Sequence, residues 1–179
     1  MNLKHFLIVL AAQTALLLAL IAQQEYALAA PTTVLLETAP VDPRDLLRGD
    51  YVILNYKVSA LANSLWDNPL PGKESEGLDV FVLLEQRGQF HEAVKASASP
   101  LIAQANQVLL RARLVRSWNG GSLRVEYGLE RYYVEEGTGN PRGKLTVQVA
   151  VSAAGKPVIK QVFIDGKPYA EAMRAQMKP

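Results

Sequence analysis

The chain has 179 residues, with 19 lysine and arginine residues against 17 aspartate and glutamate residues, so its formal net charge is only +2. This length fits one domain of ordinary size plus an accessory segment. Cysteine is absent, which excludes a disulfide framework and any thiolate metal site. The basic residues are scattered among the acidic ones, so we expect no nucleic-acid partner.

The N-terminal segment is apolar and differs in kind from the rest of the chain. Phe6 to Ala22 contains no charged residue, while Lys4 precedes it and Glu25 follows it. This length is near the lower limit for a helix that crosses about 30 Å of hydrocarbon. We therefore predict a transmembrane anchor at residues 6–22 that binds membrane lipid. Lys4 and the α-amine favour a cytoplasmic N-terminus at residues 1–5.

A secretory signal is the alternative to this anchor. Ala27-Leu28-Ala29 offers a small-residue cleavage site directly before Ala30. The charge-free run is long for the apolar core of a signal, which favours the anchor. Both alternatives predict an extracytoplasmic, β-rich domain at residues 30–179, on the periplasmic side of the cytoplasmic (inner) membrane.

Alternation of apolar and polar residues predicts short strands along most of this domain. The expected strands are Thr33–Thr38, Asp50–Ser59, Val80–Gln86, Gln89–Ala96, Gln107–Arg116, Leu123–Tyr127, Lys144–Val151 and Pro157–Ile164. Ala60–Gly77 contains two prolines and is expected to be a long surface loop. Tyr169–Met177 is expected to form a short helix. We predict a mainly β fold, an antiparallel sandwich or a partly closed barrel, after one N-terminal transmembrane helix.

The alternation also predicts which side chains are buried. Within the second strand the expected core side chains are Val52, Leu54, Tyr56 and Val58. Within Gln107–Arg116 the expected core side chains are Val108, Leu110, Ala112 and Leu114, while Arg111 and Arg113 point outward. The same rule places His91 on the face shared by Gln89 and Lys95, which we expect to face solvent. Trp66 and Trp118 are expected to pack locally.

One segment combines acidic residues and tyrosines at the start of a predicted strand. Asp50 begins the face that carries Tyr56, so its carboxylate requires a hydrogen-bonding or charged partner such as Arg48. In one interpretation, Asp42 and Asp50 hold the start of a central strand in place. In the other interpretation, they form an acidic pocket beside Tyr51 and Tyr56.

A second segment, Tyr127–Gly139, is rich in tyrosine and glutamate and ends in glycines. A pair of carboxylates such as Asp50 and Glu130 can do acid/base chemistry if their surroundings separate their pKa values. The alternative is a charged strand in which Glu130 pairs with a neighbouring arginine. The candidate binding residues of the two segments are Asp42, Arg48, Asp50, Tyr51, Tyr56, Glu130 and Tyr132.

Other catalytic arrangements find little support in the sequence. The chain contains only two histidines, His5 and His91, and His5 adjoins the apolar segment. A serine–histidine–aspartate triad would depend on His91 alone. A zinc site would have one histidine and carboxylates as ligands, which is a poor set. We therefore expect no metal site and no cofactor.

Three segments of the chain match the pattern of a known family. Gly49–Tyr56 satisfies the pattern G-D-Y-x-x-L-x-Y, and Tyr127–Gly137 and Val162–Pro168 follow in the family's order. The chain resembles the GDYXXLXY family on these segments. The resemblance implies a membrane-anchored bacterial protein with one N-terminal helix and a β-rich domain, found with polytopic membrane proteins. Pro141 and Gly143 stand where the family has a more helical, acidic stretch, and no catalytic residue can be transferred.

These features favour a binding or scaffolding domain over an enzyme. The anchor, the low net charge and the missing catalytic arrangement predict a membrane-anchored extracytoplasmic domain that acts with a polytopic membrane protein. An envelope enzyme that uses Asp50 and Glu130 is the first alternative. A secreted soluble binding protein is the second, and it requires cleavage after Ala29.

Overall fold

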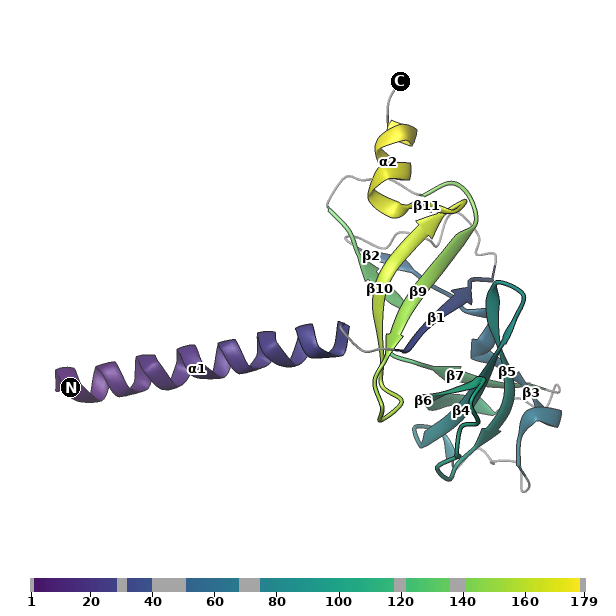
Figure 1. The fold of residues 1–179 in the computed structure, drawn as a ribbon, viewed down its shortest axis with the longest axis horizontal. Coiled ribbons are helices and arrows are strands. Elements are labelled where there is room, and N and C mark those ends of the chain that lie inside the picture. The colour runs from purple at the N-terminus through teal and green to yellow at the C-terminus, as the bar shows by residue number, and fades with distance from the viewer. Residues whose placement is uncertain are drawn as a thin grey trace.

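The computed structural model describes residues 2–28, 32–39, 51–67, 75–117, 122–135 and 141–177. Strands dominate, with one long helix at the N-terminus and a short one at the C-terminus (Figure 1). The elements are α1 (Leu3–Leu28), β1 (Thr32–Glu37), β2 (Tyr51–Ile53), the 3-10 helix η1 (Lys57–Ser59), β3 (Ala60–Ala62), the 3-10 helix η2 (Asn63–Leu65), β4 (Asp79–Arg87), β5 (Phe90–Ser97), β6 (Gln107–Ser117), β7 (Ser122–Glu126), β8 (Arg131–Tyr133), β9 (Leu145–Val151), β10 (Pro157–Ile164), β11 (Lys167–Pro168) and α2 (Tyr169–Met177).

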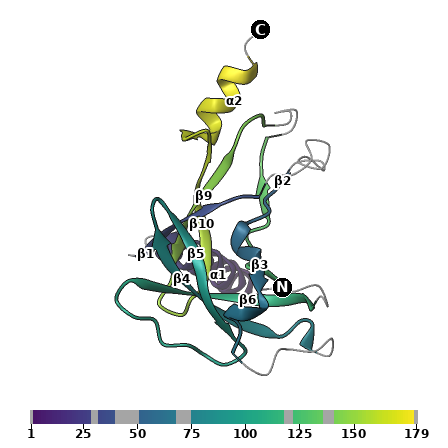
Figure 2. The same cartoon turned by 90° about the vertical axis from the view of Figure 1, so that its right-hand side faces the viewer.

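The described strands form three sheets and do not close into a barrel. A four-stranded sheet has the order β1-β9-β10-β11, a five-stranded sheet the order β3-β7-β6-β4-β5, and β2 pairs with β8. All of these strand pairs are antiparallel. The two larger sheets meet where β1 contacts β5 (Figure 1). Figure 2 shows α2 at one end of the domain, beyond β9 and β10, and the five-stranded sheet at the other. The predicted mainly β, antiparallel fold is confirmed.

Alternation predicts the buried face of β6 correctly. The interior side chains of β6 are Leu110, Ala112 and Leu114, all buried, while Arg111 and Arg113 are exposed. All three sheets contribute to one hydrophobic core. The β4–β5 hairpin turns at Gly88, whose φ of 63° is a left-handed conformation that glycine adopts without strain. The predicted C-terminal helix is present as α2.

The strand predicted at Asp50–Ser59 is interrupted. Strand β2 ends at Ile53, and Tyr56 makes a single bridge to Thr38 on the other side. The backbone of this segment has neighbours on two sides, because Leu54 N–H donates to Glu130 O while Asn55 O accepts from Ala39 N–H. The segment therefore lies between the end of β1 and the residue before β8, and η1 follows it. The predicted core face is nevertheless confirmed, since its members are buried: Val52, Leu54, Tyr56 and Val58.

The predicted surface loop at Ala60–Gly77 is wrong over its first part. Residues 60–62 form β3, which pairs with β7, and Leu61 is fully buried. Trp66 is only 7% exposed and packs in the core. A strand of three residues is too short to show a period in the sequence, which is why it escaped the alternation rule. Residues 68–74 and the predicted turn around Gly120 lie outside the described residues.

Candidate functional site

Two of the three family segments, those that begin at Gly49 and at Tyr127, meet in the small sheet formed by β2 and β8. Its register pairs Tyr51 with Tyr133, Val52 with Tyr132, and Ile53 with Arg131. Opposite residues of an antiparallel pair share one face, so this sheet has a core side and an outer side. The predicted site residues Asp42, Arg48 and Asp50 lie outside the described residues, and their roles stay predictions.

Two buried tyrosines flank the small sheet along the chain, Tyr56 after β2 and Tyr127 before β8. The Tyr56 hydroxyl donates to Leu129 O at 2.8 Å, and the Tyr127 hydroxyl donates to Val58 O at 2.8 Å. Burial raises the pKa of both phenols far above the ordinary value, and the nearby Glu130 carboxylate raises it further. Both hydroxyls are therefore neutral donors held by main-chain acceptors, and the contact of Tyr56 supports a structural role for this residue.

Glu130 is tied to the backbone around these tyrosines. Its Oε1 accepts the Tyr127 N–H at 2.6 Å, and its main-chain oxygen accepts the Leu54 N–H at 2.8 Å. Within the described part of the chain, Glu130 thus has a backbone partner where the sequence predicted an arginine. A charge-assisted hydrogen bond of this kind stabilises a turn. This contact supports a structural role for Glu130, and Asp50, its predicted acid/base partner, lies outside the described residues.

Tyr132 links the small sheet to the C-terminal helix. Its ring meets the ring of Tyr169 edge-on, with the centroids 5.2 Å apart and the planes at 70°. Burial raises the pKa of both phenols. Edge-to-face contacts of this kind are favourable beyond the area that they bury. Tyr132, a predicted binding residue, is therefore half-buried in a packing contact.

The outer side of the same sheet carries an aromatic pair, of which Tyr51 is half-buried and Tyr133 is exposed. The rings of Tyr51 and Tyr133 lie 5.9 Å apart at 60°, and the Arg131 guanidinium lies 5.4 Å from the centre of the Tyr51 ring. Tyr133 is 70% exposed. We call Tyr51, Arg131 and Tyr133 the tyrosine surface. Tyrosine and arginine are the residue types most enriched where protein interfaces gain their energy.

Sequence reasoning identified one member of the tyrosine surface and missed two. Tyr51 was predicted, but Tyr132 was chosen where Tyr133 is the exposed residue. Alternation along Arg131–Tyr133 places Tyr132 and Tyr133 on opposite faces of the strand, but it does not show which face is turned to the core. That side depends on the pairing with β2, about 80 residues earlier in the chain.

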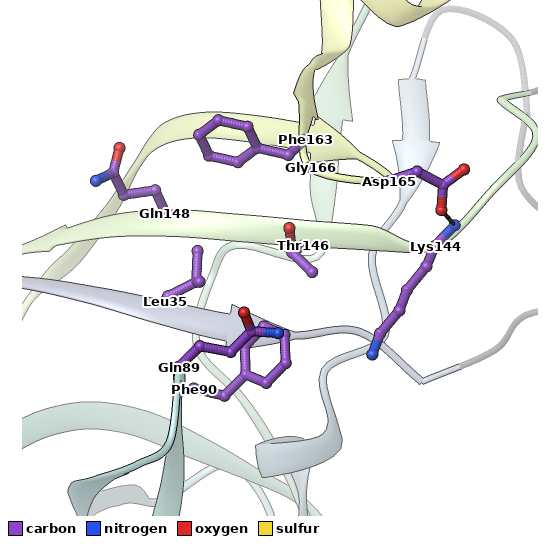
Figure 3. A pocket seen from close by; sticks show the side chains of 9 residues that line it. All are labelled: Leu35, Gln89, Phe90, Lys144, Thr146, Gln148, Phe163, Asp165 and Gly166. Atoms are coloured by element: carbon purple, nitrogen blue, oxygen red, sulfur yellow. Dashed lines mark hydrogen bonds between the residues drawn. The ribbon is translucent and has the colours of Figure 1, made fainter.

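A second candidate is the open groove between the four-stranded sheet and the β4–β5 hairpin, with a volume of about 470 Å³. Figure 3 shows Phe163 and Gly166 on one side, Gln89 and Phe90 on the other, and Thr146 between them. The lining residues are Leu35, Gln89, Phe90, Lys144, Thr146, Gln148, Phe163, Asp165 and Gly166. We call this feature the sheet groove.

A chain of charges closes one end of the sheet groove. Glu37 pairs with Lys57 at 2.7 Å and with Lys144 at 2.5 Å. The Lys144 ammonium, followed by that of Lys57, lowers the pKa of the Glu37 carboxyl. The Lys144 ammonium also lies 5.1 Å from the centre of the Phe90 ring. Asp165 Oδ1 accepts the main-chain N–H of Lys144 at 2.9 Å (Figure 3). The lysine and the carboxylates at this end are therefore already partnered.

His91 joins the two larger sheets beside the sheet groove, which corrects its predicted place on the solvent face. Its Nδ1 accepts the Leu35 N–H at 3.2 Å, and the ring is half-buried. The neutral ring therefore carries its proton on Nε2. Burial lowers the pKa of His91. The alternation rule failed because β5 is an edge strand whose outer side meets β1.

No metal site emerges from the described residues, among which no group of three or more histidine, cysteine, aspartate or glutamate side chains could hold an ion. The described contacts also bring together no nucleophile and base. The side chains of Tyr56, Tyr127 and Glu130 form hydrogen bonds with main-chain atoms.

The N-terminal helix has the composition of a membrane span. Leu3–Gln23 has a mean hydropathy of 2.2, and none of its most apolar stretch is buried in the protein. Figure 1 shows α1 extending away from the β domain, and the helix contacts β9 and β10. A signal sequence near the N-terminus would have the same length and composition as this helix.

Comparison with known proteins gives one match. The model of the GDYXXLXY protein family matches residues 13–162, which is more than half of the chain. No curated protein and no solved structure matches. The matched range contains β2 and β8, and it ends before Phe163, Asp165 and Gly166 of the sheet groove.

Proposed function

The chain belongs to the GDYXXLXY family, and we propose that it is a membrane-anchored domain that binds a partner protein through the tyrosine surface. In this proposal α1 crosses the cytoplasmic membrane once, with the N-terminus in the cytoplasm and the β domain in the periplasm. The partner is a polytopic membrane protein, which an anchored domain meets at high effective concentration.

The observation that carries the anchor is the surface of α1. Its apolar side chains are exposed all around the helix, including Leu7, Leu10, Leu17 and Ile21 at 48–58%. A helix that is apolar on every side is stable in hydrocarbon and costly in water. Between its terminal turns, an α-helix pairs its own backbone N–H and C=O groups, as a lipid environment requires.

The observation that favours a protein partner is the exposed Tyr133 and its neighbours. Tyr51 and Arg131 hold each other in place, so these side chains lose little conformational freedom when a partner covers them. Tyr133 adds a large apolar area with a polar tip, which suits a protein surface that is only partly dry.

The anchor is tested by fractionation of the full-length protein. We expect the chain to remain in the membrane pellet after an alkaline carbonate wash, with its N-terminal residues intact by mass spectrometry. Added protease should reach the β domain only after the outer membrane is opened. A soluble chain beginning at Ala30 would contradict the anchor and favour the secreted alternative.

The partner contact is tested by a photo-crosslinking residue, p-benzoylphenylalanine, placed at Tyr133 in intact cells. We expect one defined adduct with a membrane protein. If the surface contains a binding hot spot, Arg131→Ala should lower the yield of this adduct about 30-fold or more. Ile102, which is 92% exposed on another part of the domain, is the matched control position. An equal adduct from position 102, or none from position 133, would contradict the proposal.

A further inference from the structure

The floor of the sheet groove is one face of the four-stranded sheet. The register places Leu35 opposite Gln148, and Thr146 opposite Phe163. Because directly opposite residues share a face, these four side chains point to the same side of the sheet. The walls are the hairpin residues Gln89 and Phe90 and the turn at 165–166 (Figure 3).

The groove does not suit an extended peptide that joins a sheet. Such a peptide needs an open strand edge, whereas this floor is a sheet face whose backbone groups are used in strand pairing. At the nearest edge, the outward N–H of Leu35 already donates to His91 Nδ1. Recognition in the groove must therefore come from side chains.

The groove does not suit an anionic ligand either. Lys144 is the cation among its lining residues, and its ammonium is paired with Glu37. The carboxylate of Asp165 lines the same end. With Lys57 and Glu37, this end of the groove has two positive and two negative charges, so its net charge is zero. A phosphate or a carboxylate would have to displace an existing ion pair.

The remaining side chains combine aromatic rings with neutral hydrogen-bonding groups. Phe90 and Phe163 are half-buried, so part of each ring is open to a ligand. The carboxamides of Gln89 and Gln148 each offer two donors and an acceptor, and Thr146 offers a hydroxyl. A sugar ring has apolar C–H faces that pack on aromatic rings, and neighbouring hydroxyls that bond carboxamides.

We propose that the sheet groove binds a neutral saccharide. Its volume of about 470 Å³ lies in the range of small-molecule sites. The aromatic rings bind the apolar faces of the sugar, while Thr146, Gln148 and Gln89 bind its hydroxyls. The groove shares no residue with the tyrosine surface, and Phe163 and the turn at 165–166 lie beyond the part matched by the family model.

The test uses the full-length protein in a polyoxyethylene detergent, because maltoside and glucoside detergents are themselves sugars. The probes are neutral oligosaccharides of glucose, galactose and N-acetylglucosamine, followed by saturation-transfer NMR and calorimetry. We expect at least one of them to bind. Thr146→Val and Gln148→Leu should each raise its Kd about three- to tenfold, since each removes one neutral hydrogen-bonding group.

Thr33→Val is the matched control, because Thr33 lies on the same face of β1 as Leu35 but does not line the groove. Its Kd should equal that of wild type. Gln89→Ala, at an exposed turn position, provides a third variant if a sheet substitution lowers the melting temperature. Absence of binding by all neutral probes, equal Kd values in the groove variants, or preferred binding of inorganic phosphate, oligouronate or peptide would overturn the proposal.

Discussion

Tyrosines of the same two family segments serve different purposes inside and outside the core. In the core, Tyr56 and Tyr127 are 2% and 6% exposed, and each hydroxyl donates to a main-chain oxygen. On the outer side, Tyr51 and Tyr133 contact each other edge-on, and Tyr133 is 70% exposed. Within a few residues, the family segments therefore contain tyrosines that stabilise the core and tyrosines of the tyrosine surface. The presence of a tyrosine does not by itself show which of these two places it occupies.

The largest expected effect comes from removing one hydroxyl at each of the four tyrosines. Tyr56→Phe and Tyr127→Phe should each lower the free energy of unfolding by about 1–3 kcal/mol, because each leaves a buried carbonyl without its donor. Tyr51→Phe and Tyr133→Phe, the matched controls, should change it by less than about 0.5 kcal/mol. Denaturant titration of the full-length protein in one detergent gives all four values. Equal losses on the two sides would break the comparison.

A smaller effect is expected at Glu130, which lies between the buried tyrosines. Glu130→Gln replaces a charge-assisted hydrogen bond to the Tyr127 N–H by a neutral one. We expect a loss of about 1 kcal/mol, the difference between the two kinds of bond. Glu126→Gln, an exposed position on β7, is the control for loss of one negative charge. A stability equal to wild type would contradict the structural role of the Glu130 carboxylate.

The smallest expected effect is a pH dependence at the contact between the two larger sheets. Burial lowers the pKa of His91 in the folded protein, so the unfolded chain binds the proton more readily. The stabilising contribution of neutral His91 is therefore fully present above the ordinary histidine pKa of about 6.5, and it falls as the pH drops below this value. A protonated Nδ1 would also lose its role as acceptor for Leu35.

Thermal unfolding between pH 7.5 and pH 5 measures this dependence. His91→Asn keeps a hydrogen-bonding group near the position of Nδ1 but does not titrate, so its midpoint should vary less with pH than that of wild type. Glu37, whose pKa is lowered by Lys144 and Lys57, loses its stabilising effect only in more acidic solution, below about pH 4.5. A wild-type midpoint that is constant from pH 7.5 to pH 5 would contradict the role of His91.

The sequence by itself determined the features that depend on neighbouring residues. Charge-free composition identifies the helix at the N-terminus, and alternation identifies the hairpin of β4 and β5, the pair β9 and β10, and the buried face of β6. These inferences hold because side chains alternate across a strand with a period of two. The family segments were also recognisable from their residues alone.

Only the tertiary structure decided which distant segments meet. The pairing of Tyr51 with Tyr133, the break of the strand before Tyr56 and the contact of His91 with β1 each join residues 18–82 positions apart. The sheet groove likewise combines β1, the β4–β5 hairpin, β9 and β10. Alternation shows that a strand has two faces, but it does not name the strand that will cover its edge. That choice follows from how the whole core packs, and it separates Tyr133 as a surface residue from Tyr132 as a packing residue.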